Sequence, residues 1–420
     1  MIKHNTLKLL CNNIYSIIYS LKYSNIIKRD YVSFNLREII ETSESDLDAH
    51  GEAFPKCKLV GARYVSPFTK TTEKSIFSVL TWLLTRRPNP LKFPNVSNSI
   101  DLIPINKFDK DKVNNQEASF TWLGHASCYF QTDGLYFITD PIWSDRASPS
   151  QYFGPKRYIK PSVPLEDLKI DVVLLSHTHY DHLDYNTAKK IGNKALWIVP
   201  LGVKKILKSM GIDNCVELDW WSSQQLSTAT GTDLKVVFLP AKHWTSRTPF
   251  DRNQCLWGGF AVITPNKRFY FAGDTAYSKV FKTIGEEYGP FDFSAIPIGA
   301  YKPQWFMKDF HCDPEEAVQI HLDVKSKQTA AIHWGTFPLA DEEIIEPALE
   351  LARARNLKNA DNFFTMGHGE TIILGDKPQY DMATLYPHLL DYYKKHYQQN
   401  DIINRKTKNT IINSNTPNLL

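Results

Sequence analysis

The 420-residue sequence predicts an α/β fold in which two β-sheets pack face to face and helices cover the outer faces. Two features of the pattern lead to this fold class. Strand-like runs outnumber helical ones, and they come in an early block before they alternate with helices. In addition, no Gly/Ser-rich or Pro-rich linker interrupts Phe120 to Gly369, so this span is expected to close as one unit.

The strands are expected where short apolar runs meet turn residues. Phe120 to Tyr129 and Leu135 to Thr139 are expected to be two strands joined through Gln131-Thr-Asp-Gly134, which is a hairpin signal. Helices are expected at Val203 to Met210, Tyr277 to Tyr288, Pro314 to Val324 and Glu342 to Arg355, the third with an N-cap at Asp313 followed by a first-turn proline and two acids. The other expected strands are residues 171–175, 195–199, 234–239, 259–263, 268–272, 293–298 and 329–332.

The composition excludes several classes of protein. Hydrophobic residues make up 42% of the chain, which is enough for a large core, and the formal net charge of +4 is too small and too dispersed for a nucleic-acid binder. The six cysteines are scattered without a CxxC pair, which argues against a disulfide framework and a thiolate zinc site and fits a reducing compartment. No apolar run approaches the ~20 residues that a membrane-spanning helix needs.

The most informative motif is Ser-His-Thr-His-Tyr-Asp-His-Leu-Asp at Ser176 to Asp184. It places three imidazoles and a carboxylate within six residues, directly after the apolar run that begins at Asp171: His177, His179, Asp181 and His182. Imidazole nitrogen and carboxylate oxygen are the ligands that borderline metals such as zinc prefer. His177 and His179 are suited to grasp one ion, and Asp181 and His182 point elsewhere if the chain turns there, so the spacing suggests two metals.

Three more strand-like runs end in a side chain of the same kind. Leu234 to Pro240 leads to His243, Phe269 to Ala272 leads to Asp274, and Thr329 to Ile332 leads to His333. A single histidine after a strand is more often a packed core residue. Three repeats of this placement, together with the cluster, favour a shared metal site.

This order of ligands resembles the metallo-β-lactamase superfamily. Five further motifs resemble the branch of phospholipases D that hydrolyse N-acylphosphatidylethanolamine, and the likeness runs from about Val65 to about Glu370. They are Trp122-Leu-Gly-His-Ala-Ser127, Thr139-Asp-Pro-Ile-Trp143, Gly299-Ala-Tyr-Lys-Pro-Gln-Trp-Phe-Met307, His311-Cys-Asp-Pro-Glu-Glu-Ala317 and Ile332-His-Trp-Gly-Thr-Phe337. The ligand set alone is specific only for the superfamily, and the last three motifs point to the phospholipase branch.

The resemblance implies the αββα sandwich with the metal site at one edge of the sheets. It also implies two Zn²⁺ ions per chain that share a hydroxide, which attacks phosphorus so that N-acylethanolamine leaves and phosphatidate remains. The implied ligands are His177, His179 and His243 for the first ion, Asp181, His182 and His333 for the second, and Asp274 as the bridge. We therefore expect Asp181 and Asp274 to be catalytic as well as metal-binding.

Other residues have competing interpretations. His311 is expected to touch the phosphate, to assist the leaving group, or to be structural. Tyr301, Trp305 and the Trp220-Trp221 pair are expected to contact lipid or to pack in the core. His125 is expected to support the ligands or to be structural, and Asp140 is a candidate for holding a ligating histidine in its tautomer. Asp184 is a candidate for a helix N-cap, and His321 and His368 are candidates for structural roles.

We expect three segments. Residues 1–60 form an N-terminal extension, residues 61–375 form the phospholipase domain, and residues 376–420 form a C-terminal helix with a disordered tail. Leu7 to Leu21 carries apolar residues at helical spacing, with lysines nearby and no acid before Asp30. This pattern is typical of a basic amphipathic helix on an anionic bilayer, of a mitochondrial or other organelle-targeting segment, or of a helix packed on the domain. We expect an intracellular, peripheral membrane protein.

The expected partner is a phospholipid at a membrane surface, with no nucleic acid, and the sequence leaves a homodimer open. Two other functions also stay open. One is a hydrolase of the same fold that acts on another phosphodiester, a lactone or RNA. The other is a membrane-surface binding protein without turnover, which the presence of all seven ligands argues against.

Overall fold

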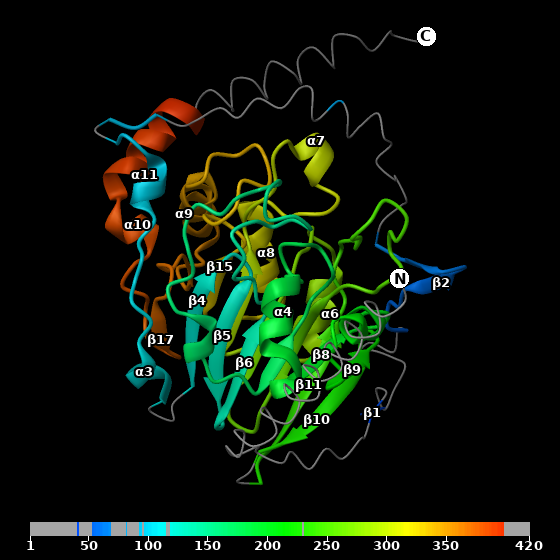
Figure 1. Ribbon diagram of the computed structural model, residues 1–420. Helices are drawn as coiled ribbons and strands as arrows, with labels where there is room; N and C mark the ends of the chain where they lie inside the picture. Colours follow the sequence, from blue (N-terminus) through cyan, green and yellow to red (C-terminus); the bar gives the residue numbers. More distant parts are fainter. Residues whose placement is uncertain are drawn as a thin grey trace, which may run out of the picture.

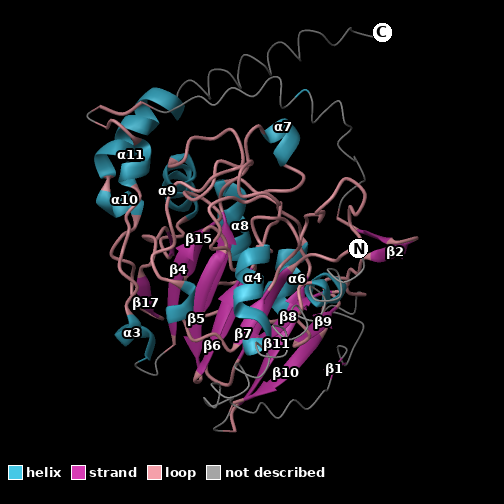
Figure 2. Cartoon of the chain, viewed as in Figure 1, coloured by secondary structure: helices cyan, strands magenta, loops and turns pink. Residues whose placement is uncertain are grey.

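The computed structural model describes residues 40–41, 53–68, 81, 92–94, 96–114, 118–228 and 231–398. Two mixed β-sheets pack face to face, and helices lie outside them (Figures 1 and 2). This arrangement confirms the expected αββα sandwich. The predictions for the N-terminal segment up to Leu21 and for the tail beyond Gln398 fall outside the described residues.

One sheet has seven strands in the order β17-β4-β5-β6-β7-β8-β9. The first four strands of this order pair antiparallel, and β6 to β9 pair in parallel. The strands are β4 (Ser119–Gly124), β5 (Ser127–Thr132), β6 (Leu135–Thr139), β7 (Val172–Leu174), β8 (Leu196–Pro200), β9 (Cys215–Leu218) and β17 (Thr371–Ile373).

The other sheet has eight strands in the order β1-β10-β11-β12-β13-β14-β15-β16. It too changes from antiparallel to parallel pairing, at β13. The strands are β1 (Ile40–Glu41), β10 (Ser223–Ser227), β11 (Asp233–Leu239), β12 (Gly259–Ile263), β13 (Arg268–Phe271), β14 (Phe293–Pro297), β15 (Thr329–Ile332) and β16 (Phe363–Phe364), and a separate hairpin joins β2 (Lys58–Val60) to β3 (Arg63–Val65).

The four predicted helices are present as α5 (Lys204–Ser209), α6 (Val280–Glu287), α8 (Pro314–Asp323) and α9 (Glu346–Lys358). The predicted cap of α8 is confirmed, because the Glu316 amide donates to the Asp313 carboxylate at 2.9 Å and the Asp313 amide donates back to Glu316 at 3.2 Å. The other α-helices are α3 (Lys110–Asn114), α4 (Tyr185–Ile191), α7 (Gln304–Met307), α10 (Met382–Leu385) and α11 (Pro387–Tyr393). As predicted, Asp184 caps α4 by accepting from the Asn186 amide.

The single strand expected over Phe120 to Tyr129 is wrong. The chain turns there between β4 and β5, because Gly124 has φ +107° and His125 has φ +53°. Gly124 is the sequence signal for this turn, because a glycine inside a strand pattern suggests a bulge or bend, whereas a histidine in the left-handed region is uncommon. The hairpin between β5 and β6 is confirmed, with positive φ at Asp133 and Gly134 as a tight primed turn requires.

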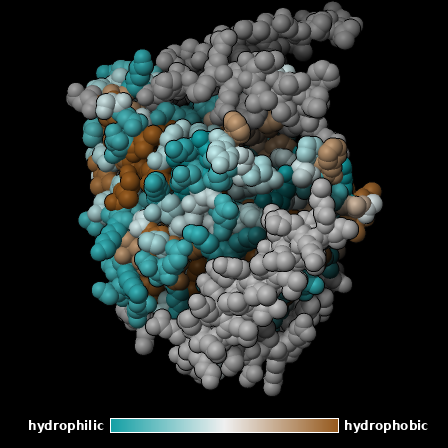
Figure 3. Space-filling model, in the orientation of Figure 1, coloured by the Kyte–Doolittle hydropathy of each residue, from teal (hydrophilic) through white to brown (hydrophobic). Residues whose placement is uncertain are grey.

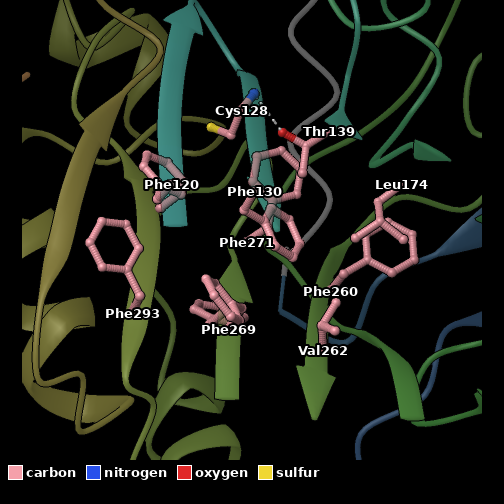
Figure 4. Close-up of a pocket in the computed structure, with 12 residues that line it drawn as sticks. Phe120, Cys128, Phe130, Thr139, Leu174, Phe260, Val262, Phe269, Phe271 and Phe293 are labelled. Carbon is pink, nitrogen blue, oxygen red and sulfur yellow. Dashed lines mark hydrogen bonds between the residues drawn. The ribbon is translucent and has the colours of Figure 1, made fainter. Parts of the chain in front are cut away.

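Aromatic rings fill the space between the two sheets (Figure 4). Phe130 of one sheet stacks on Phe269 of the other at 4.7 Å, and Phe120 meets Phe293 at 4.5 Å between ring centroids. The cavity that these residues leave measures about 10 Å³, which is at the lower limit for one water molecule. The interior is therefore packed core, and it has no room for a lipid chain.

Trp220 and Trp221 belong to this core, with exposed fractions of 1% and 2%. Trp221 stacks on Phe54, and each indole N–H donates to a backbone carbonyl. The interpretation of this pair as a lipid-contacting groove is therefore wrong.

The described cysteines, five in number, are all free thiols, as expected from their spacing. Within the described part of the chain, no helix combines the length and the apolar character needed to cross a bilayer. On the face drawn in Figure 3, the described surface is largely hydrophilic, and its apolar residues gather in separate patches.

Candidate metal centre

The predicted ligands meet at one edge of the sandwich because each follows the carboxyl end of a strand. His177, His179, Asp181 and His182 follow β7 in the seven-stranded sheet. His243, Asp274 and His333 follow β11, β13 and β15 in the eight-stranded sheet. The two sheets therefore contribute different halves of one cluster, in which every member except Asp181 and His179 is buried.

Three imidazoles form one side of the cluster. His177 Nε2 lies 2.8 Å from His179 Nδ1, and His243 Nε2 lies 3.3 Å from the same atom. Their ring nitrogens come close enough together to hold one ion.

Asp181, His182 and His333 form the other side. Asp181 Oδ2 lies 3.2 Å from His182 Nε2 and 3.5 Å from His333 Nε2. His125, which we expected to support the ligands or to be structural, adds its Nε2 at 2.9 Å from the same oxygen. The ligand atoms of these four residues lie close enough together to hold a second ion.

Asp274 lies between the two sides. Its Oδ2 is 3.9 Å from His177 Nε2, 3.8 Å from His243 Nε2 and 3.2 Å from His182 Nε2, and its Oδ1 is 3.2 Å from His333 Nε2. One carboxylate thus faces ring nitrogens of both groups, which is the placement that a bridging ligand requires.

The buried atoms of the cluster fit a bound metal. Within the described residues, His182 Nε2, His333 Nε2 and Asp274 Oδ1 have no hydrogen-bond partner, although they converge on the same space. A buried polar atom without a partner costs about 1–3 kcal/mol, so several such atoms facing each other require compensation. A set of imidazole nitrogens and carboxylate oxygens is suited to divalent metals such as zinc.

The electrostatics of the cluster favour cations. Burial raises the pKa of Asp274, but the adjacent His182 and His333 outweigh it and hold that pKa well below its ordinary value. Burial and neighbouring histidines lower the pKa of His177 well below its usual range. Asp274 is therefore a carboxylate at neutral pH, and His177 is a neutral imidazole with a lone pair to offer.

Contacts behind the ligands fix the orientation of the imidazoles. Asp140 makes one of these contacts, in the role that the sequence suggested for it. Asp140 Oδ2 lies 2.6 Å from His182 Nδ1 and Oδ1 accepts from the Ser176 amide at 2.7 Å. His243 Nδ1 lies 2.8 Å from the Phe310 carbonyl. Because Nδ1 of both rings faces an oxygen, a ring proton is held there, and Nε2 is the nitrogen that would bind metal.

The backbone is strained around the cluster. His125, Asp140, Ala300 and His333 have φ of +53°, +36°, +62° and +60°, although none is glycine. Such conformations cost of order 1 kcal/mol or more per residue and persist where the surrounding structure enforces them.

The remaining candidates lie in different surroundings. His311 is next to the cluster, with Nδ1 4.0 Å from Asp274 Oδ2 and its ring 5.0 Å from that of His243. Trp305 is 48% exposed on α7. Tyr301 is buried, and its hydroxyl donates to Glu346 at 2.9 Å. Its expected contact with substrate stays a prediction.

His321 and His368 are buried, as expected for structural residues. His321 Nδ1 pairs with the Thr329 hydroxyl at 2.8 Å, and the ring of His368 packs on Trp122 at 4.4 Å. A cavity of about 130 Å³ beside the cluster was not anticipated. His333, Phe337, Leu339 and Ala340 line it, and the sequence signals for it were the motif that contains His333 and the motif that begins at Gly299.

Comparisons with known proteins agree with the fold. Residues 136–334 match the family model described as "Beta-lactamase superfamily domain". A possible metal-dependent hydrolase from Veillonella parvula superimposes with a TM-score of 0.50 at 15% identity, covering 61% of this chain and all of that one. This likeness supports the fold alone.

Two relatives identify the branch. The chain is 42% identical over 304 residues to N-acyl-phosphatidylethanolamine-hydrolyzing phospholipase D 1 of Caenorhabditis elegans, covering 69% of this chain and 85% of that protein. It is 37% identical over 237 residues to the mitochondrial N-acyl-phosphatidylethanolamine-hydrolyzing phospholipase D of Saccharomyces cerevisiae, covering 55% of this chain and 50% of that protein. The chain is therefore a metal-dependent hydrolase and belongs to the N-acyl-phosphatidylethanolamine-hydrolysing phospholipase D family within the metallo-β-lactamase superfamily.

Proposed function

We propose that this protein is a zinc-dependent phospholipase D that hydrolyses N-acylphosphatidylethanolamine to N-acylethanolamine and phosphatidate. The observation that carries the proposal is the position of Asp274, whose carboxylate faces His182 Nε2 at 3.2 Å and His177 and His243 Nε2 at 3.9 and 3.8 Å. Water supplies the oxygen that joins phosphorus, and the bond from phosphorus to the ethanolamine oxygen breaks.

In this proposal His177, His179 and His243 hold one zinc ion and Asp181, His182 and His333 hold the other, with Asp274 shared. When bound, the two ions activate water at neutral pH and offset negative charge on the phosphoryl oxygens. No serine or cysteine nucleophile is required.

His311 is proposed to contact the phosphoryl group. Its side chain is partly exposed, at 14%, whereas most of the surrounding imidazoles are fully buried. Its Nδ1 has no hydrogen-bond partner in the described part of the protein. A neutral imidazole in this position can donate a hydrogen bond to a phosphoryl oxygen or to the leaving oxygen.

We propose that the protein meets this substrate at a membrane surface. Exposed aromatic side chains lie on two loops and on α7: Tyr152 at 85% and Phe153 at 78% on one loop, Phe250 at 82% on the other, and Trp305 at 48% on the helix. The loop of Tyr152 and Phe153 leads back to Ser144, which bonds to Asp184 at the end of the metal-binding motif. Aromatic rings favour the interfacial region of a bilayer, so these loops are suited to touch lipid.

The loop of Phe250 is fixed in the same way. The Arg247 guanidinium donates to the carbonyls of Thr178 at 2.8 Å and Leu183 at 2.9 Å, both within the metal-binding motif. We propose an amphipathic N-terminal segment as a second membrane contact. The name of the yeast relative states a mitochondrial location, and we propose the same location as one possibility for this protein.

The test pairs elemental analysis with a lipid assay. We expect about two zinc ions per chain, and we expect mixed micelles of N-acylphosphatidylethanolamine to yield N-acylethanolamine and phosphatidate, identified by mass spectrometry. The His333→Ala protein is the inactive control. At most one ion per chain under zinc-replete conditions would contradict the dinuclear site. Turnover of another phosphodiester or a lactone in place of this lipid would contradict the substrate.

A further inference from the structure

Two residues with left-handed backbone conformations, which follow strands of different sheets, are hydrogen-bonded to each other beside the cluster. His125 lies in the turn between β4 and β5 of the seven-stranded sheet, and His333 follows β15 of the eight-stranded sheet. The His333 amide donates to the His125 carbonyl at 2.9 Å, and the two rings lie 4.1 Å apart between centroids. The conformation of one residue therefore depends on that of the other.

The backbone of His125 is held from both sides. Its amide donates to the Thr336 hydroxyl at 2.7 Å, and its carbonyl accepts a second hydrogen bond from the Trp122 indole N–H at 2.9 Å. The three backbone partners of His125, which are Thr336, Trp122 and His333, are all buried. These contacts explain how a non-glycine residue is kept at φ +53°, which L-residues otherwise avoid.

The side chain of His125 points toward a third element. Its Nε2 lies 2.9 Å from Asp181 Oδ2, the oxygen that also faces His182 and His333. An ionised carboxylate only accepts hydrogen bonds, so Nε2 of His125 carries the proton in this contact. Asp181 is 15% exposed on a loop, whereas His125 is 2% exposed in the core, so the histidine is the better fixed partner.

We propose that His125 is a positioning residue that assembles the metal site of Asp181, His182 and His333. Its carbonyl holds the main chain of His333, and its imidazole holds the carboxylate of Asp181. A single residue thereby sets two ligands that belong to different sheets. This inference rests on the two-ion assignment proposed above, and it does not depend on the identity of the substrate.

The expected effect is a loss of affinity for one of the two ions. Groups that orient metal ligands typically contribute about 10–100-fold to metal affinity. His125→Leu keeps a similar volume and the backbone contacts but removes the donor to Asp181. His125→Gln removes the ring but keeps an N–H donor that can reach the same oxygen. Weakening by Leu and recovery by Gln is the pattern that identifies a positioning role.

His321→Leu is the matched control. His321 is also a buried histidine with one side-chain hydrogen bond, to Thr329 at 2.8 Å. Thr329 precedes His333 by four residues of strand and is therefore about 13 Å away at ~3.3 Å per residue. His321→Leu therefore shows what a loss of stability does to zinc affinity when the metal ligands stay in place.

The experiment measures zinc affinity of the full-length proteins by competition with a chromophoric chelator, and records the visible spectrum of the Co²⁺-substituted forms. Thermal melting in excess EDTA reports the stability of each variant without metal. We expect His125→Leu to bind one ion as the wild type does and the other about 10–100-fold more weakly. We expect His125→Gln to recover most of this loss, and His321→Leu to bind both ions normally.

Three results would overturn the inference. The first is unchanged affinity for both ions in His125→Leu. The second is equal weakening of both ions, which a general loss of structure would produce. The third is a His125→Gln protein as weak as His125→Leu with an altered cobalt spectrum, which would make His125 a direct ligand. A wild-type chain that binds only one ion would contradict the two-ion assignment itself and this inference with it.

Discussion

Asp140→Asn tests whether the orientation of His182 matters as the structure suggests. Asp140 is fully buried and accepts from the Ser176 amide at 2.7 Å, the Ser176 hydroxyl at 2.5 Å and His182 Nδ1 at 2.6 Å. Asparagine replaces one oxygen with an NH₂ group that only donates. If this group faces His182, the ring proton must move to Nε2, the nitrogen that points at Asp181 and Asp274. If it faces Ser176, two N–H groups oppose each other.

The magnitude follows from these contacts. A hydrogen bond to a charged group contributes about 1.5–3 kcal/mol, and either orientation of the amide loses one such bond. The loss of a group that orients a ligand lowers metal affinity by about 10–100-fold, which corresponds to about 1.4–2.7 kcal/mol. We therefore expect Asp140→Asn to bind one zinc ion about 10–100-fold more weakly and to melt at a lower temperature in EDTA.

Asp381→Asn is the matched control for this experiment. Asp381 is likewise buried and accepts from the Thr365 amide and hydroxyl at 3.1 and 3.0 Å and from Arg355 at 2.7 Å. It should lower the melting temperature while zinc affinity, measured by chelator competition, stays normal. Equal zinc affinities in wild type and Asp140→Asn would refute the argument, because the ring of His182 would then be oriented without the carboxylate.

Three further changes have defined outcomes. Asp274→Asn should abolish lipid hydrolysis while the protein still folds, as a cooperative thermal transition in EDTA would show, and a near-normal rate would show that Asp274 is not the bridge. Burial raises the pKa of Glu342 from its ordinary value of 4.5 to about 7, so the free energy of unfolding should decline as the pH rises from 4.5 to 7. Urea unfolding of Glu342→Gln should show a smaller decline than wild type over this pH range, and an equal decline would contradict the role of Glu342. Removal of residues up to Arg29, or Phe153→Ser with Phe250→Ser, should weaken sedimentation with anionic vesicles and spare hydrolysis in micelles, whereas unchanged sedimentation of both would place the membrane contact elsewhere.

The strands that carry the ligands could be predicted from the sequence because their signal is local. Each is a short apolar run followed at once by a polar residue, and β7, β11, β13 and β15 all lie within the expected ranges to within a residue or two. Strand β10 was missed because its sequence, Ser-Gln-Gln-Leu-Ser, has little apolar pattern. Helix α9 begins at Glu346, four residues later than expected, where Pro347 fits the first turn.

The contacts that organise the site could not be predicted in this way. His125 meets Asp181 across 56 residues of sequence, and Asp140 meets His182 across 42. These pairs depend on how strands align across the sheet, which no local pattern encodes. The turn at His125 escaped prediction for a related reason, because its backbone is held by Thr336 and Trp122 and not by its own preference.

The left-handed conformations of His125, Asp140 and His333 set backbone strain against side-chain contacts at the same positions. Glycine adopts positive φ freely, so replacing any of these residues with glycine would relieve backbone strain of order 1 kcal/mol. It would also remove buried hydrogen bonds to charged groups, which contribute about 1.5–3 kcal/mol each, so the strain persists because the contacts of the metal centre outweigh it. Attempts to stabilise the enzyme are better directed at the outer helices, where a more stable backbone carries no such conflict.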